Sequence, residues 1–356
     1  MSLASALARP EVLSLEPYAP ATWEPALERL HANENPWRAM GDASHAGLNR
    51  YPEPYPLALE ARLAALYGVA PECLLAGRGS DEGIDLLVRA FCVAGRDEVL
   101  TCPPTFGMYA FAARVQGALV REVPLLRDHD YALDGESLAA AVSPAVKLLF
   151  LCTPNNPTGT ALELECIARL ARALAGSCLL VVDEAYAEFS KQPSAIGLLP
   201  AAPNLVVLRT LSKAYALAGA RLGAVIASPD IVGLLRRIIP PYAIATPTSE
   251  ATLDALEPAR LALARERIAR IIAERTRLGA ALAALPHCTR VFPSQANFVL
   301  ARFRDAARVL ATARTAGFLL RDFSQSAPTA GCLRISVGTA DQSDRLIAAL
   351  NPRTAP

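Results

Sequence analysis

Apolar and polar residues alternate along the chain in a pattern that predicts strands and helices in turn. From Leu57 onward, short apolar runs are separated by stretches with helical periodicity, such as the one in which Ile84, Leu87 and Phe91 share a face. The predicted strands lie at 74–76, 98–101, 119–123, 147–152, 178–183, 205–209 and 222–227. The predicted helices lie at 57–67, 80–93, 106–117, 163–174 and 230–238. Seven strands with interleaved helices predict an open, mostly parallel α/β sheet.

The pattern changes after Pro247, where a long stretch rich in Ala, Arg and Leu predicts a helix over roughly 259–285. Beyond it, the predicted strands lie at 297–301, 318–321 and 331–337, and the predicted helices at 305–315 and 341–350. This second region predicts a smaller α+β domain. We therefore expect an N-terminal arm at 1–32, a large domain at 33–250, and a small domain at 251–356 that packs with the arm.

Composition and charge exclude several classes of protein. The formal net charge of the 356 residues is +1, so the chain lacks the basic character of a nucleic-acid binder. Its apolar runs are short and interrupted by Arg, Glu or Pro, which excludes a membrane-spanning helix. The first residues also lack the charged start and apolar core of a signal peptide. We expect a cytoplasmic protein.

The cysteines and histidines indicate neither disulfides nor a metal site. None of the eight cysteines forms a C-x-x-C pair, and several lie in apolar runs, which is typical of buried free thiols in a reducing compartment. The four histidines, His31, His45, His129 and His287, do not have the spacing of metal ligands or of a catalytic triad. No metal is expected.

Lysine is scarce in this chain, which has only Lys147, Lys191 and Lys213 against 32 arginines. Arginine supplies positive charge equally well but cannot lose its proton near neutral pH, so a retained lysine is a candidate amine nucleophile. Lys147 begins an apolar run and Lys191 lies in a polar stretch, typical of a strand edge and a loop. Lys213 follows an apolar run and lies close to Thr210 and Ser212, a setting that suits a Schiff base beside a phosphate.

A glycine-rich segment, Gly77–Gly83, lies between a predicted strand and a predicted helix. It lacks the third glycine of the dinucleotide motif because Glu82 takes that place. Two interpretations stay open from the residues alone. Glycine before a helix N-terminus forms a cradle of N–H groups for one phosphate. Alternatively, the segment is an ordinary capped helix with Ser80 as its N-cap.

Two further polar groups follow predicted strands. Asn156 lies in a Pro/Asn/Gly run that is either a simple turn or a rigid mount for an amide at the sheet edge. Asp183 ends a buried strand, where an unpaired carboxylate is costly. A helix cap would satisfy it, and so would the protonated ring nitrogen of a pyridine cofactor.

Four motifs in this order and spacing carry a resemblance to a known family: NPTG from Asn156, DEAY from Asp183, SKAYALAGARLG from Ser212 and CLRISVGT from Cys332. The chain resembles the fold type I pyridoxal-phosphate enzymes over about residues 18–350 and, within them, the histidinol-phosphate aminotransferases. The more particular matches to the latter are 33–37 (NENPW), 49–53 (NRYPE), 79–83 (GSDEG), 103–109 (PPTFGMY) and 320–322 (LRD).

The resemblance implies pyridoxal 5'-phosphate as cofactor and a role for each matching residue. Lys213 would hold the cofactor as a Schiff base and then move the substrate proton as acid and base. Asp183 would keep the pyridine nitrogen protonated. Asn156 and Tyr186 would bind the phenolic oxygen of the ring. The residues implied for the phosphate and the ring face are Gly79, Ser80, Asp81, Phe106, Thr210, Ser212 and Arg221.

The resemblance also implies substrate and partner contacts. Arg334 would bind the α-carboxylate of glutamate, and Arg321, assisted by Tyr18, would bind the substrate phosphate or the distal carboxylate of glutamate. Asn35 would be a further substrate contact. Tyr51 would reach the cofactor phosphate of the neighbouring subunit, which implies a homodimer. The family usually has tyrosine where this chain has Phe106, so stacking is kept and a hydroxyl contact is lost.

The implied reaction is amino transfer from L-glutamate to imidazole-acetol phosphate, giving L-histidinol phosphate and 2-oxoglutarate, in histidine biosynthesis. One alternative is an aromatic-amino-acid aminotransferase of the same fold. Another is a phosphothreonine decarboxylase, which would break the bond from Cα to the carboxylate. A ligand-sensing regulator is disfavoured because only about thirty residues precede Asn33 and they contain no basic helical pair.

Overall fold

Seven strands form the sheet of the large domain in the computed structural model, which describes residues 2–24 and 26–351. The strands are β1 (Leu74–Gly77), β2 (Glu98–Thr101), β3 (Leu119–Glu122), β4 (Val146–Cys152), β5 (Leu179–Asp183), β6 (Leu205–Thr210) and β7 (Gly223–Ala227). Their order is β1-β7-β6-β5-β4-β2-β3. Only the pairs that include β7 are antiparallel. The predicted α/β sheet is confirmed, with each strand placed to within one residue at either end.

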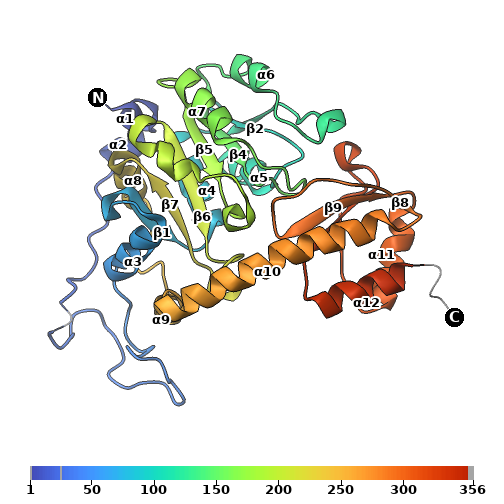
Figure 1. Ribbon diagram of the computed structural model, residues 1–356. Coiled ribbons are helices and arrows are strands. Elements are labelled where there is room, and N and C mark those ends of the chain that lie inside the picture. Colours follow the sequence, from blue (N-terminus) through green and yellow to red (C-terminus); the bar gives the residue numbers. More distant parts are fainter. Residues whose placement is uncertain (1, 25, 352–356) are drawn as a thin grey trace.

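Helices cover both faces of this sheet (Figure 1). One face packs against α1 (Leu3–Leu7), α2 (Pro10–Ser14), α4 (Ser80–Phe91), α5 (Met108–Gln116) and α8 (Pro229–Arg236). The other packs against α3 (Leu57–Tyr67), α6 (Gly135–Ala140), α7 (Leu164–Ala173) and α9 (Thr246–Ala255). Along β4, Leu148 and Phe150 enter the first core while Leu149 and Leu151 enter the second. Strands buried on both faces are continuous apolar runs, which is why they are visible in the sequence.

A single long helix, α10 (Pro258–Ala283), leads from the large domain to the small one (Figure 1). The small domain contains β8 (Cys288–Val291), β9 (Phe298–Phe303), α11 (Ala306–Thr315), β10 (Arg321–Asp322), β11 (Cys332–Ser336) and α12 (Ala340–Leu350). Its antiparallel sheet has the order β10-β11-β9-β8. None of the described helices is long and apolar enough to cross a membrane.

Several details differ from the expected elements, and the four helices α1, α2, α6 and α9 were not predicted. The strand predicted at 318–321 begins only at Arg321. The edge strand β8 was not predicted, because its sequence CTRV is short and half polar. The described part of the N-terminal arm also packs elsewhere than expected, since Ala4 and Leu7 join the large-domain core. Leu256 belongs to that domain's other core, so we place the domain boundary at the start of α10.

The described residues between 15 and 56 contain no helix or strand and extend away from the large domain (Figure 1). This N-terminal segment exposes many large apolar side chains, among them Leu30 at 93% and Met40 at 104%. Contiguous exposed apolar surface on a folded protein marks an interaction site.

Candidate active site

A cavity of about 690 Å³ lies at the carboxyl ends of β4, β5 and β6, where the large domain meets β10 and β11 of the small domain. Ligands bind at this edge in open α/β sheets. Twelve of the residues predicted from the sequence line the cavity: Ser80, Asp81, Phe106, Asn156, Asp183, Tyr186, Thr210, Ser212, Lys213, Arg221, Arg321 and Arg334.

Lys213 is the only one of the three lysines that lines this cavity. Lys147 donates to the carbonyl of Pro144 near the start of β4, and Lys191 is exposed on a loop. Burial lowers the pKa of the Lys213 amine, and the positive charge of Arg334 lowers it further, although nearby carboxylates oppose the shift. A lowered pKa increases the fraction of neutral amine, which is the nucleophilic and proton-accepting form.

Asp183 ends β5 with its carboxylate buried at 2% exposure. One oxygen accepts a hydrogen bond from the hydroxyl of Tyr109 at 2.8 Å, and the other accepts from the N–H of Ala185 at 3.0 Å. Burial raises the pKa of Asp183 to about 6, and no described cationic side chain forms an ion pair with it. A buried carboxylate with hydrogen bonds but without a counter-charge suits a ligand that carries a positive charge.

The N-terminus of α4 forms an anion cradle beside Arg221. Gly79 is the N-cap, with φ +81°, and no side chain caps the helix. The interpretation in which Ser80 is the N-cap is therefore wrong, since Ser80 is the first helical residue. Arg221 donates to the Asp81 carboxylate at 3.2 Å and to the hydroxyl of Ser212 at 3.5 Å, which places a guanidinium beside the N-terminus of α4.

Close packing explains two glycines of this cradle. A Cβ on Gly79 would lie 2.8 Å from Nη2 of Arg221, and a Cβ on Gly223 would lie 2.5 Å from the backbone nitrogen of Ser80. Thr210 supports the cradle from the side of β6. Its hydroxyl lies 3.0 Å from that of Ser212 and donates a hydrogen bond to the carbonyl of Leu222. Gly79 thus shapes the cradle from behind without lining the cavity.

Asn156 and Tyr186 lie together beside Asp183. The amide of Asn156 donates to the Tyr186 hydroxyl at 3.3 Å and accepts from a guanidinium nitrogen of Arg334. Tyr186 packs edge-on against Phe298 of the small domain, with ring centroids 5.2 Å apart. Burial raises the pKa of Tyr186, so its hydroxyl stays protonated and available as a donor.

Arg321 and Arg334 are direct cross-strand partners on β10 and β11. Arg334 lies over the rings of Phe298 and Phe323, at 5.2 and 5.5 Å from guanidinium carbon to centroid. Neither arginine forms an ion pair with a described carboxylate. Two neighbouring like charges are unfavourable unless an anion lies between or near them, so the pair points to an anionic ligand in the cavity.

The comparisons with known proteins agree with this geometry. Residues 27–350 match the family described as aminotransferase class I and II. A curated histidinol-phosphate aminotransferase from Stenotrophomonas maltophilia (strain R551-3) is 50% identical over 98% of this chain and 97% of its own. The chain belongs to the histidinol-phosphate aminotransferase family.

Solved structures show how wide the fold relationship of this aminotransferase is. The histidinol-phosphate aminotransferase from Sinorhizobium meliloti, in complex with pyridoxal 5'-phosphate, is 30% identical with a TM-score of 0.78, covering 86% of this chain and 83% of that one. An L-threonine-O-3-phosphate decarboxylase from Porphyromonas gingivalis is 25% identical with a TM-score of 0.73, over 85% and 90%. Different chemistries therefore share this architecture.

Pyridoxal 5'-phosphate is the cofactor of this aminotransferase, and the donor set of the cavity fits it. The anion cradle of α4 and Arg221 matches a phosphate, and the buried carboxylate of Asp183 matches a cationic ring nitrogen. Lys213 supplies an amine with a lowered pKa between them. Each of the three features is incomplete without a ligand of the complementary kind.

Several residues of this aminotransferase's site were missed from the sequence, among them Phe323, which lines the cavity, and Tyr109. Tyr109, on α5, is fully buried, stacks on Phe150 at 4.8 Å and donates its hydroxyl to Asp183. The sequence feature that could have indicated Tyr109 is its position three residues after Phe106. This spacing puts both rings on one side of the start of α5. A tyrosine inside an apolar helix is otherwise indistinguishable from core packing.

Besides Gly79, three predicted residues of this aminotransferase lie outside the cavity of their own chain. Tyr18 is 70% exposed, Tyr51 is 51% exposed, and Asn35 is exposed as well. All three belong to the N-terminal segment that extends from the large domain. One chain alone does not bring them to the site, so their assigned roles stay predictions.

Proposed function

We propose that this protein transfers the amino group of L-glutamate to imidazole-acetol phosphate, giving L-histidinol phosphate and 2-oxoglutarate, in histidine biosynthesis. The observation that carries the proposal is a pair of arginines, Arg321 and Arg334, that have no carboxylate partner among the described residues and line a cavity that contains the amine of Lys213. The family membership adds the reaction class and the cofactor.

Lys213 and Asp183 are the residues of this chain that take part most directly in the proposed chemistry. The bound pyridoxal phosphate supplies a ring that accepts electrons from the substrate carbon. The Lys213 amine, with its lowered pKa, takes the proton from Cα of the substrate and returns it to the C4′ carbon of the cofactor. Asp183 holds the positive charge of the ring nitrogen because burial makes that pairing strong.

The remaining large-domain residues orient the cofactor. The N–H groups at Ser80 and Asp81, the Ser212 hydroxyl and the Arg221 guanidinium form the phosphate site. Asn156 and Tyr186 present donors to the phenolic oxygen, and Phe106 offers an aromatic face beside them. Fixed donors of this kind need no rearrangement when charge develops during the reaction.

The arginine pair explains how one site accepts two unlike substrates. A guanidinium binds a carboxylate through two parallel hydrogen bonds, so Arg334 suits the α-carboxylate of glutamate. Histidinol phosphate has no carboxylate, and its phosphate would bind Arg321, which also suits the distal carboxylate of glutamate. Phe106 and Phe323 also line the cavity, and their aromatic rings suit an imidazole.

We further propose a homodimer that works in the cytoplasm, with Tyr51 entering the site of the partner subunit. Eleven of the seventeen exposed large apolar side chains of the described residues lie between Leu13 and Leu57. A second copy is a symmetric way to cover such a surface. The same contact would bring Tyr18 and Asn35 to the substrate pocket. All eight cysteines are free, as expected in a reducing compartment.

A single half-reaction tests the proposal. The visible absorption band of the purified enzyme is followed while histidinol phosphate, phenylalanine and phosphothreonine are added to separate samples. Loss of the band at the lowest concentration of histidinol phosphate supports the proposed function. Loss only with phenylalanine supports an aromatic-amino-acid aminotransferase. Release of carbon dioxide from phosphothreonine supports a decarboxylase.

A further inference from the structure

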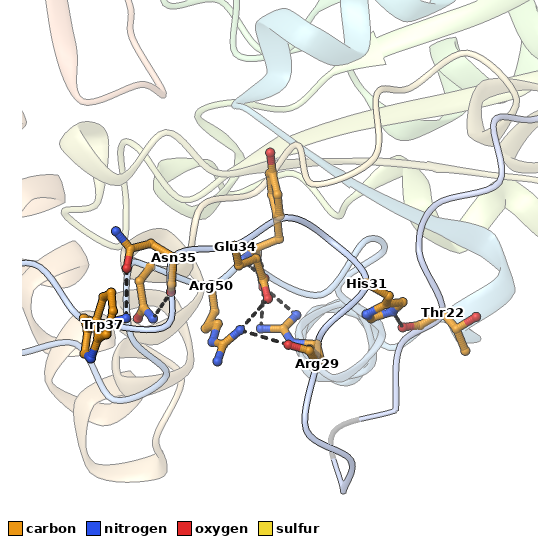
Figure 2. Close-up of polar contacts among 9 residues, drawn as sticks. Thr22, Arg29, His31, Glu34, Asn35, Trp37 and Arg50 are labelled. Atoms are coloured by element: carbon orange, nitrogen blue, oxygen red, sulfur yellow. Dashed lines mark hydrogen bonds and ion pairs between the residues drawn. The ribbon is translucent and has the colours of Figure 1, made fainter.

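A buried carboxylate lies in the exposed N-terminal segment. The side chain of Glu34 is only 2% exposed, although its neighbours on the segment are mostly exposed. Figure 2 shows Arg29 and Arg50 converging on it from two sides of the loop. A buried carboxylate is costly unless it is paired and hydrogen-bonded. The burial of Glu34 in an exposed segment is therefore not explained by hydrophobic packing, and it calls for a functional explanation.

The contacts of Glu34 are complete. Oε2 accepts from Arg50 at 2.9 Å, and Oε1 accepts from the N–H of Tyr51 at 2.7 Å and lies 3.3 Å from Arg29. Burial alone would raise the pKa of Glu34, but these hydrogen bonds and the two positive charges hold it below its usual value. Glu34 is therefore ionised at neutral pH. We call the side chains of Arg29, Glu34 and Arg50 the Glu34 clamp.

The clamp acts on the main chain of Tyr51 from both sides. Glu34 takes the N–H of Tyr51, and Arg29 donates to its carbonyl at 3.1 Å. The tyrosine ring lies against Tyr242 of the large domain, with centroids 4.8 Å apart. The Tyr51 hydroxyl has no hydrogen-bond partner among the described residues, and the residue is 51% exposed. The backbone is fixed while the functional end of the side chain is left free.

We propose that the Glu34 clamp is a positioning device that holds Tyr51 in place to act in the active site of a second copy of this chain. The inference rests on the proposed homodimer and on the role of Tyr51 in it. Fixing Tyr51 before association lowers the entropy lost when its hydroxyl binds the partner's cofactor phosphate. Glu34, Arg29 and Arg50 touch neither substrate nor cofactor in this scheme.

Hybrid dimers separate this role from a purely structural one. A chain with Lys213→Ala carries a dead site and an intact arm, and a chain with Tyr51→Ala carries an intact site and a defective arm. Two different affinity tags allow purification of the mixed dimer. Its one complete site combines Lys213 of the second chain with Tyr51 of the first. Glu34→Gln is then placed on either chain.

If the clamp positions Tyr51, the effect of Glu34→Gln should depend strongly on which of the two chains carries it. Glu34→Gln on the Lys213→Ala chain removes the charge that holds the working Tyr51, and we expect weaker cofactor retention and a lower kcat by about tenfold, the size expected for lost charge-assisted hydrogen bonds. On the Tyr51→Ala chain the same substitution affects only the arm that reaches the dead site, and we expect kcat to change by less than about twofold. Hydrogen exchange at the Tyr51 amide should accelerate in the Glu34→Gln chain.

Arg38→Ala is the matched control on the Lys213→Ala chain. Arg38 also donates to two carbonyls of the segment, those of Ser44 and His45, but not to Tyr51. It should leave the hybrid's activity unchanged. Equal effects of Glu34→Gln on either chain would overturn the clamp alone. A hybrid without restored activity would overturn the role of Tyr51 in the partner site, and the clamp with it.

Discussion

Asp183→Asn should stabilise the cofactor-free protein while impairing cofactor binding and abolishing efficient catalysis. Burial raises the pKa of Asp183 from 3.8 to about 6. One pKa unit corresponds to 1.36 kcal/mol, so ionising this carboxyl in the folded, cofactor-free protein costs about 3 kcal/mol. Asparagine has the same shape, accepts from the N–H of Ala185, and donates to the oxygen of Tyr109. It therefore removes the cost of a buried charge and keeps one hydrogen bond to each of these two partners.

The sign and the pH window follow from the same raised pKa. Below pH 3.8 the carboxyl is protonated in both the folded and the unfolded chain, so Asp and Asn differ little. Above pH 6 it is ionised in both, and the full cost of burial is present in the folded state. The free energy of unfolding of the wild type should therefore fall by about 2 to 3 kcal/mol relative to Asp183→Asn as pH rises from about 4 to 7.

Urea denaturation of the cofactor-free proteins, at one fixed protein concentration and at pH 4, 5, 6 and 7, measures this difference. Asp254→Asn is the matched control, because Asp254 is 55% exposed and its ion pair with Arg260 is a surface pair worth about 1 kcal/mol or less. Saturation with pyridoxal phosphate should reverse the order, since the cofactor stabilises the wild type by binding. An Asn variant no more stable than the cofactor-free wild type at pH 7 would refute the reasoning.

Three further variants test single contacts. Lys213→Ala should abolish the cofactor adduct trapped by borohydride, and an adduct found by mass spectrometry on Lys147 or Lys191 would show that the wrong lysine was chosen. Tyr109→Phe removes a hydrogen bond to a charged group, worth about 1.5–3 kcal/mol, so cofactor binding at pH 7 should weaken by roughly ten- to a hundredfold in equilibrium dialysis. An unchanged cofactor affinity would show that Tyr109 contributes only to packing. Arg321→Ala should raise KM for histidinol phosphate far more than for phenylalanine in steady-state assays, whereas equal losses would argue against a phosphate contact.

The sheet and several residues of the cavity could be predicted because they follow rules that can be read along the chain. Strands buried on both faces are continuous apolar runs, so their ends are sharp in the sequence, and Asp183 and Thr210 lie at those ends. Parallel strands bring their carboxyl ends to one edge. The scarcity of lysine pointed to Lys213 by the same local reasoning.

Features that depend on tertiary contacts could not be predicted from residues alone. The cross-strand pairing of Arg321 with Arg334 depends on the register of two short antiparallel strands, and only the family resemblance singled these arginines out. Tyr109 is hidden in an apolar helix until its hydroxyl is seen beside Asp183. The wrong N-cap assignment of Ser80 has a similar cause, because only the backbone shows that Gly79 holds the cap position.

The placement of α10 between the domains has an evolutionary consequence. Lys213, Asp183 and the anion cradle of α4 belong to the large domain, whereas Arg321 and Arg334 lie on strands of the small domain, which has a hydrophobic core of its own. Arg334 is coupled to the large domain, because it donates to Asn156 and its charge lowers the pKa of Lys213, and substitutions of residues in contact are not additive. Selection can therefore alter the substrate through Arg321 on β10 with less effect on the buried groups around Asp183, whereas a change of Arg334 on β11 would alter both.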